Sequence, residues 1–261
     1  MNSETPPVDP PDSPVVTTSV MARMLNVFAA PGDVFNEVRQ SAPNTANWLM
    51  PAILLMVVGW ACHFLVMAQP ETMQQINAMA ERGIQQQVEA GKLTQAQADV
   101  AHDQAIKFAG ISARVAGILA PPAAAFATPF WWGLLLWLLG GKLLKGGFSF
   151  MKAVEVAGLS SMILVLEAVL KTLLILATGN LFAGPGPVLL IRDFDAQNLL
   201  HGVLAKLSLT TLWVLAVRAV GIARLGAGSF ARSAGVVFGF WILWNGLWTG
   251  IGLAIASLLQ R

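Results

Sequence analysis

The chain has 261 residues, of which 56% are hydrophobic and 11% charged, with a formal net charge of +2. An ordinary soluble domain carries about 25% charged residues, so this composition argues against one. The basic residues are scattered, without the Lys/Arg cluster that nucleic-acid binding or an anionic-lipid patch would suggest. Cys62 is the only cysteine in the sequence, which excludes an intrachain disulfide and a metal site closed by thiols.

The N-terminal part is predicted to precede the membrane domain. Residues 1–20 are rich in Pro, Ser, Thr and Asp and lack the basic and apolar regions of a signal peptide. We expect them to form a disordered tail, because they bury too little apolar surface to offset the entropy of ordering. Residues 21–47 hold two amphipathic segments separated by Pro31-Gly32. They are expected on the cytoplasmic side, either in the membrane interface or packed against the end of a helix bundle.

Five apolar runs predict an all-α, polytopic membrane bundle. Each is long enough to cross a bilayer, which takes roughly 20 apolar residues in a helix. The second run contains Pro121-Pro122 and Pro129, which predict a kink or break. Carbonyl groups freed there must find partners inside the bundle. The predicted spans of this domain, which occupies 48–257, are 48–68, 114–140, 153–177, 198–221 and 234–257, with a glycine-rich turn at 140–147.

A polar, Gln- and Ala-rich segment separates the first two spans. Residues 70–112 contain mostly strong helix formers, interrupted at Gly91. Thr94 followed by Gln97 matches a capping box, in which each side chain bonds the other residue's backbone N–H. We predict an extramembrane helical hairpin, with one helix near 71–90 and a second from 95 into the next span. A disordered loop is the alternative.

The positive-inside rule predicts the orientation of the spans. Short loops on the N-terminal side carry more Lys and Arg than the short loop on the opposite side, which holds Arg192. The N-terminus is therefore expected inside, with the C-terminus and the hairpin outside.

Charges within spans are the first candidates for function, because they are costly there. Glu167 and Lys171 are four residues apart, hence neighbours on one helix face. Lys206 lies at a similar depth in the next span, so Glu167 is expected to bond both lysines. The cluster has two interpretations, a structural link between two spans or an ion- or proton-coupled site.

No catalytic or metal-binding pattern accompanies these charges. The histidines lack ligand spacing, and neither a zinc-binding nor a nucleophile-elbow motif occurs. We therefore expect no catalytic residue, no metal and no cofactor.

The fifth span carries small residues on one face. Gly235, Gly239, Gly246 and Gly250 share that face, since eleven residues make about three turns. Such a groove allows another helix to approach closely. It is expected to serve either as an internal packing face or as the seam of a homo-oligomer.

Three stretches are similar to the Yip family, the membrane proteins named for interaction with Rab-type GTPases, in its bacterial branch. The first is Val27 to Phe35 (VFAAPGDVF) followed by Trp48-Leu49-Met50-Pro51, and the second is Gly146 to Glu155. The third is the order of five spans itself, with a cytoplasmic N-terminus. The match covers about 25–257. The resemblance implies a non-enzymatic five-span bundle without catalytic residues. In eukaryotic members it implies vesicle traffic and GTPase recruitment, a role that depends on machinery absent from bacteria.

The leading functional hypothesis is a membrane scaffold or organiser that binds proteins or lipids. Its expected partners are the bilayer and a membrane or cytoplasmic protein, not nucleic acid. Its expected location is the cell membrane, the inner membrane if the source is bacterial. The alternative is a small transporter or permease component with a midplane site near Glu167 and Lys206. An intramembrane enzyme is the third hypothesis, and it lacks a nucleophile–base or metal set.

Overall fold

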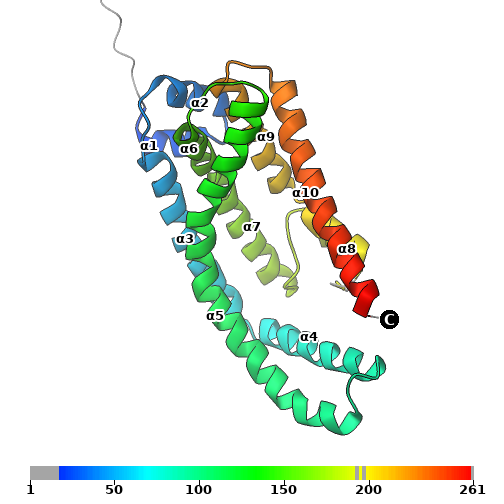
Figure 1. The fold of residues 1–261 in the computed structure, drawn as a ribbon. Helices are drawn as coiled ribbons and strands as arrows, with labels where there is room; N and C mark the ends of the chain where they lie inside the picture. Colours follow the sequence, from blue (N-terminus) through cyan, green and yellow to red (C-terminus); the bar gives the residue numbers. More distant parts are fainter. Residues whose placement is uncertain (1–17, 192–193, 196–197, 260–261) are drawn as a thin grey trace, which may run out of the picture.

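The computed structural model describes residues 18–191, 194–195 and 198–259, which form helices and loops without a strand (Figure 1). The predicted tail lies almost wholly outside these residues, as do Arg192 and Arg261. The elements are α1 (Val20–Asn26), α2 (Pro31–Gln40), α3 (Ala46–Met67), α4 (Pro70–Glu89), α5 (Gln95–Leu136), η1 (Trp137–Leu143), α6 (Phe150–Ser160), α7 (Met162–Thr178), η2 (Pro187–Leu190), α8 (Leu199–Lys206), α9 (Leu209–Leu225) and α10 (Phe230–Leu259).

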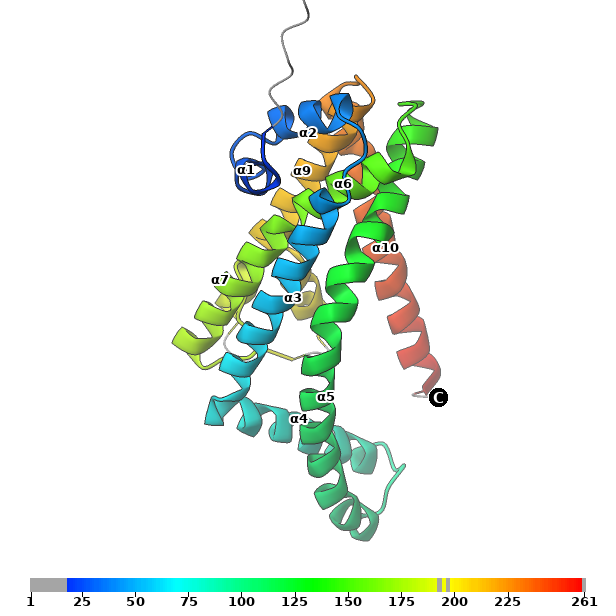
Figure 2. The same cartoon turned by 90° about the vertical axis from the view of Figure 1, so that its left-hand side faces the viewer.

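The long helices run side by side, and the ends of the described chain lie at opposite ends of the bundle (Figures 1 and 2). Helices α1 and α2 lie at one end with the loops 144–149 and 226–229; we call this the capped end. Helix α4 and the C-terminus of α10 lie toward the other end. Four helical segments are long and apolar enough to span a membrane, and the pair α8–α9, bent by 50°, makes a fifth if counted as one span. The predicted number of spans thus requires a bent fourth span.

Helix α5 passes through its prolines without a break. It is continuous from Gln95 to Leu136, so the break considered at Pro121-Pro122 is absent. Pro122 has no N–H to bond the carbonyl of Ile118, and the indole Nε1 of Trp60 on α3 donates to that carbonyl at 2.9 Å. The freed carbonyl therefore has a partner inside the bundle, as the membrane environment requires.

The break lies instead in the fourth span, which was predicted as one continuous helix. The N–H of Leu209 donates to the carbonyl of Pro185 at 2.9 Å, outside the helix ladder. A Cβ atom on Gly186 would lie 2.7 Å from the carbonyl oxygen of Leu207. The loop before α8 thus packs directly on the backbone between α8 and α9, and this contact accounts for the bend.

The boundary between the second and third spans also differs from the expected glycine turn. Helix α5 continues through the π-helical turn η1 as far as Leu143, beyond the predicted end at 140. The third span begins at Phe150, where Ser149 caps the helix by accepting from the N–H of Lys152. Helices α6 and α7 form a single candidate span, Phe150–Thr178.

Both helices of the predicted hairpin are present. Helix α4 ends at Glu89, and α5 begins at Gln95 with the predicted capping box between Thr94 and Gln97. The start of α4 is fastened near the end of α7, since Gln75 donates to the carbonyl of Gly179 and accepts from the N–H of Leu181. The placement of this hairpin outside the membrane stays a prediction.

Helices α1 and α2 pack against the bundle, the second of the two alternatives for residues 21–47. Val27, Phe35 and Val38 are fully buried in a core shared with α6, α7 and α9. Met21 and Leu25 point away from this core, with exposed fractions of 58% and 61%. The capped end is therefore a packed unit that keeps an apolar outer face on α1.

Candidate functional site

Three polar side chains meet where the start of α3 crosses α6. Asn47, in the first turn of α3, donates through Nδ2 to Glu155 Oε2 at 2.6 Å. The Lys152 ammonium lies 3.3 Å from Glu155 Oε1 and donates to the carbonyl of Val38 at the end of α2. Asn47 and Glu155 are fully buried, and Lys152 is 8% exposed. Buried charges are tolerated when they are paired and hydrogen-bonded, and these side chains provide both.

A close approach between the two helices makes this contact possible. A Cβ atom on Gly158 would lie 2.3 Å from Cα of Trp48 and 3.0 Å from the carbonyl oxygen of Asn47. Gly158 is three residues after Glu155, on the same face of α6. A larger residue at 158 would push the start of α3 away from the Glu155 carboxylate.

A second ion pair extends the network to the N-terminal helices. Arg23 on α1 lies 3.2 Å from the Glu37 carboxylate on α2 and donates to Asn47 Oδ1 at 3.4 Å. The hydroxyl of Thr18 donates to Glu37 at 2.6 Å. Asn47 therefore links the Arg23–Glu37 pair to the Lys152–Glu155 pair. We call these six residues, Thr18, Arg23, Glu37, Asn47, Lys152 and Glu155, the cap network.

The environment of Glu37 favours its ionised form. Burial is the largest single influence and raises the pKa of this carboxyl. Hydrogen bonds from Thr18 and Arg23, with the charge of Arg23, together outweigh burial and hold the pKa below its ordinary value of 4.5. Glu37 is therefore ionised at neutral pH and pairs with the Arg23 cation.

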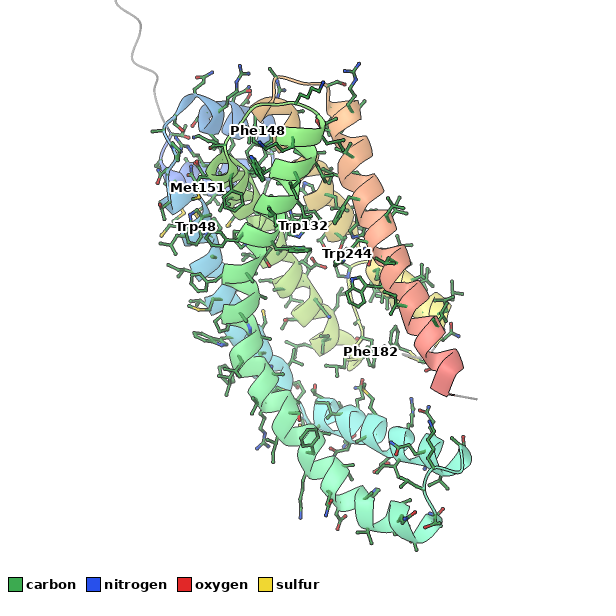
Figure 3. All side chains as sticks on the ribbon, in the orientation of Figure 1. Trp48, Trp132, Phe148, Met151, Phe182 and Trp244 are labelled. Atoms are coloured by element: carbon green, nitrogen blue, oxygen red, sulfur yellow. The ribbon has the colours of Figure 1, made fainter. Side chains whose placement is uncertain are left out.

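Arg218 forms a separate buried cationic site on α9. Its guanidinium carbon lies 4.0 Å from the ring centroid of Trp132 on α5, which Figure 3 labels. Its Nε donates to Ser160 Oγ at 3.3 Å, and Arg218 is 2% exposed. Cations over the face of Trp are stabilised by the ring quadrupole, most strongly when desolvated. Arg218 thereby joins α9 to α5 and α6.

The predicted charge cluster is only partly assembled. Glu167 and Lys171 line one cavity of about 120 Å³, whereas Lys206 is not among its lining residues. Lys206 instead donates to Thr249 Oγ1 on α10 at 3.1 Å. Among the described residues, no ion pair within 4.0 Å joins Glu167 to either lysine, so the expected double bonding is absent. For Lys206, the physical reason is the bend that follows it, which the prediction of a straight fourth span did not include.

The glycine face of α10 meets no other part of the described chain. Cβ atoms built on Gly235, Gly239, Gly246 and Gly250 would have no neighbour within 4 Å. Internal packing on this face is therefore absent. The opposite, bulky side contributes Trp244, which packs against Trp131 of α5 with ring centroids 5.6 Å apart. An oligomer seam along the glycines stays a prediction.

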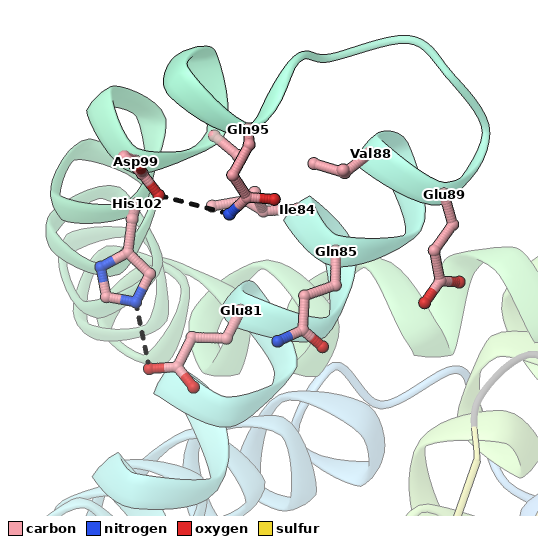
Figure 4. A pocket seen from close by; sticks show the side chains of 9 residues that line it. Glu81, Ile84, Gln85, Val88, Glu89, Gln95, Asp99 and His102 are labelled. Atoms are coloured by element: carbon pink, nitrogen blue, oxygen red, sulfur yellow. Dashed lines mark hydrogen bonds and ion pairs between the residues drawn. The ribbon is translucent and has the colours of Figure 1, made fainter.

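The hairpin has its own open cleft, of about 570 Å³, between α4 and α5 (Figure 4). His102 Nε2 lies 3.4 Å from Glu81 Oε1, and Gln95 donates to Asp99 at 3.4 Å. The side chains of His102 and Glu81 are each 44% exposed. This cleft is thus a solvated polar surface, and no group of three or more His, Cys, Asp or Glu in the described chain is arranged to hold a metal ion.

Two buried charges, Glu155 and Arg218, were not predicted as site residues. Glu155 and Arg218 both lie inside predicted spans, 153–177 and 198–221, so the criterion that selected Glu167 selects them as well. Arg218 lies near a span end and was counted with the basic loop residues, and Glu155 was noted only as the end of the family-like stretch 146–155. Asn47, just before the Trp48-to-Pro51 motif, is uncharged and gave no signal of its own.

Comparison with known families agrees with the motifs at 27–35, 48–51 and 146–155. Residues 25–258 match the family model described as the Yip1 domain. No curated protein and no solved structure matches the chain. The family match and the long apolar helices together make this a multi-pass membrane protein. The match covers nearly all of the chain, which therefore belongs to the Yip1 domain family.

Proposed function

We propose that this protein is a non-enzymatic membrane organiser that binds other proteins or lipids through its capped end. The observation that supports it most is where the family-like stretches meet. The stretch 27–35 builds the start of α2, 48–51 lies in α3, and 146–155 leads into α6. These elements converge on the cap network, which holds α1 and α2 against the bundle. A fixed cap is suited to presenting a constant surface to a partner.

The outer face of α1 is the surface that we expect a partner to contact. Met21 and Leu25 lie one turn apart and are both largely exposed. Apolar anchors of this kind commonly provide the centre of a protein interface or enter the headgroup region of a membrane. The proposed location is the cell membrane, with the capped end in the cytoplasm.

Site-specific photocrosslinking tests this proposal. A photoreactive amino acid is placed at Leu25, with Val100 on the hairpin, 70% exposed, as the control site. In native membranes, we expect Leu25 to give a discrete protein or lipid adduct that Val100 does not give. The adduct should weaken when Glu155→Gln loosens the cap. Identical adducts at both sites, or none at Leu25, would contradict the proposal.

The transporter alternative rests on the small cavity beside Glu167 and Lys171. Its volume of about 120 Å³ admits only a small solute, and the loop segment Pro185-Gly186 forms part of its wall. Glu167→Gln distinguishes the two functions. Loss of a growth or uptake phenotype at unchanged protein abundance would favour transport, whereas loss of the protein itself indicates a structural charge.

A further inference from the structure

A second cleft lies at the capped end, between α2, α9 and the start of α10. Its volume is about 470 Å³. The polar side of its lining is formed by Asn36 and Arg39 of α2 and Arg224 of α9. The apolar side includes Val220 and Ala223 of α9 and Phe230 of α10. A site with cationic and apolar sides matches an amphiphilic ligand better than a fully hydrated ion.

Two guanidinium groups line this cleft without a carboxylate partner. No ion pair within 4.0 Å joins Arg39 or Arg224 to an acidic side chain of the described residues. The acid nearest Arg39 in sequence, Glu37, is engaged by Arg23 and Thr18. Like charges that face one cleft raise its free energy, and an anion placed between them removes that cost.

Arg224 packs against the backbone of α2. Arg224 lies over the first turn of α2, where its Nη2 is 3.1 Å from the position of a Cβ atom on Gly32. Glycine at 32 thus leaves the space that the guanidinium fills. Arg39 and Asn36 are three residues apart on α2, so both reach the same side of the helix. Guanidinium forks match the geometry of phosphate oxygens, and an amide adds a further donor.

The cleft lies at the end of a candidate membrane span, where lipid headgroups are expected. Arg224 is in the last turn of α9, where the apolar fourth span ends. Exposed basic residues surround this end of the bundle, namely Lys142, Lys145 and Arg232 in or beside its loops. Basic residues at a span end attract anionic headgroups.

We infer that this cleft binds the phosphate headgroup of an anionic phospholipid. Arg39 and Arg224 hold the phosphate oxygens, Asn36 donates to the headgroup, and Val220 and Phe230 contact the glycerol and upper acyl chain. The inference rests on the proposed function, in which the capped end binds proteins or lipids, and it names the lipid that is bound. The crosslinking test at Leu25 leaves both arginines unchanged, so either claim can fail without the other.

Native mass spectrometry in an uncharged detergent tests the site. The full chain is titrated with phosphatidylglycerol, with phosphatidylcholine and with inorganic phosphate. We expect tight retention of one phosphatidylglycerol and at least tenfold weaker binding of phosphatidylcholine. Arg39→Gln/Arg224→Gln should weaken phosphatidylglycerol binding by about tenfold or more, since each arginine near the headgroups contributes to the attraction.

Two charge-matched variants serve as controls. Lys145→Gln/Arg232→Gln removes two charges from the same end of the bundle outside the cleft, and Arg82→Gln/Lys92→Gln removes two from the hairpin. Both should retain the lipid. If the first control loses it equally, the capped end attracts lipid diffusely and the cleft is not the site. If inorganic phosphate binds as well as the lipid and displaces it, the ligand is free phosphate, and the inference fails.

Loss of folding is separated from loss of binding by the thermal melt of each variant. Arg39 is exposed and no hydrogen bond in the described chain uses its side chain, so Arg39→Gln alone tests the cleft if the double variant unfolds. If the folded Arg39→Gln protein retains phosphatidylglycerol as tightly as the wild type does, the inference is overturned. Arg39→Lys/Arg224→Lys keeps the charges without the forks, and its affinity should fall between those of the wild type and the Gln variant.

Discussion

At the scale of single residues, pairing decides what the buried charges do. Glu155 is fully buried and shared between Asn47 of α3 and Lys152 of its own helix α6, so the contact between these two helices depends on one carboxylate. Removing one partner of a buried pair leaves the other charge uncompensated, at a cost of about 3–5 kcal/mol. The same side chains would be of little consequence on an exposed surface.

Glu155→Gln is therefore expected to lower the free energy of unfolding by about 3–5 kcal/mol, because the Lys152 ammonium loses its carboxylate. The melting temperature in detergent checks this. Glu89→Gln on the exposed part of α4 is the matched control and should change the free energy of unfolding by less than about 0.5 kcal/mol. Equal melting temperatures for the two variants would contradict the structural role of Glu155.

The pairing of Glu37 predicts a pH dependence. Its pKa is lowered in the folded protein, so the ionised carboxylate stabilises the fold above its unfolded-state value of 4.5. That contribution is lost as the pH falls through the lower folded-state pKa. The melting temperature of Glu37→Gln should lie below that of the wild type at neutral pH, and the difference should shrink only in acid. A difference that persists unchanged to the lowest pH at which the protein folds would refute this assignment.

At the scale of elements, helix contacts depend on positions that leave no room for a side chain. Gly158 lies against the backbone of Trp48, whereas Gly235 on α10 has nothing near it. Alanine is favoured over glycine within helices by roughly 0.5–1 kcal/mol. The two glycines therefore make a matched pair of sites for one substitution.

Gly158→Ala should lower the free energy of unfolding by about 1–3 kcal/mol, as overpacking does in cores. Gly235→Ala should be neutral or slightly stabilising. Thermal melts of both variants in the same detergent test these two expectations. A destabilised Gly235→Ala would indicate that the open face of α10 is packed against another molecule in the sample.

The elements themselves were largely predictable, but their breaks were not. Apolar length identified the spans, and Thr94 with Gln97 identified the start of α5. The prolines of the second span suggested a break that the helix does not have, because Trp60 supplies the hydrogen bond that Pro122 cannot. The bend before Leu209 had no local signal, because its cause is the distant segment Pro185-Gly186. Contacts between elements far apart in sequence do not appear in the periodicity of either one.

At the scale of the whole molecule, folding gathers charges that are scattered in the sequence. Arg39 and Arg224 come from the first and the last thirds of the chain yet line one cleft. The sequence shows no basic cluster, because no single segment contains one. The cap network is hidden in the same way, since its members come from α1, α2, α3, α6 and Thr18, two residues before α1.

The basic residues at the capped end also predict the orientation of the molecule in the membrane. Basic loops at the capped end predict that this end is cytoplasmic and that the C-terminus lies outside. A reporter pair fused after Arg261 checks this, with one reporter active only inside the cell and the other only outside. We expect the outside reporter alone to be active. Activity of the cytoplasmic reporter would invert the predicted topology.

The central claim is that the cap network fastens α1 and α2 to the membrane bundle. Hydrogen exchange of the full chain in detergent, followed by mass spectrometry, tests it most directly. We predict slow exchange of the amides of α1 and α2 in the wild type and much faster exchange in Glu155→Gln, with α10 unchanged. Fast exchange of both helices in the wild type, or equal protection in a folded Glu155→Gln protein, would contradict the claim.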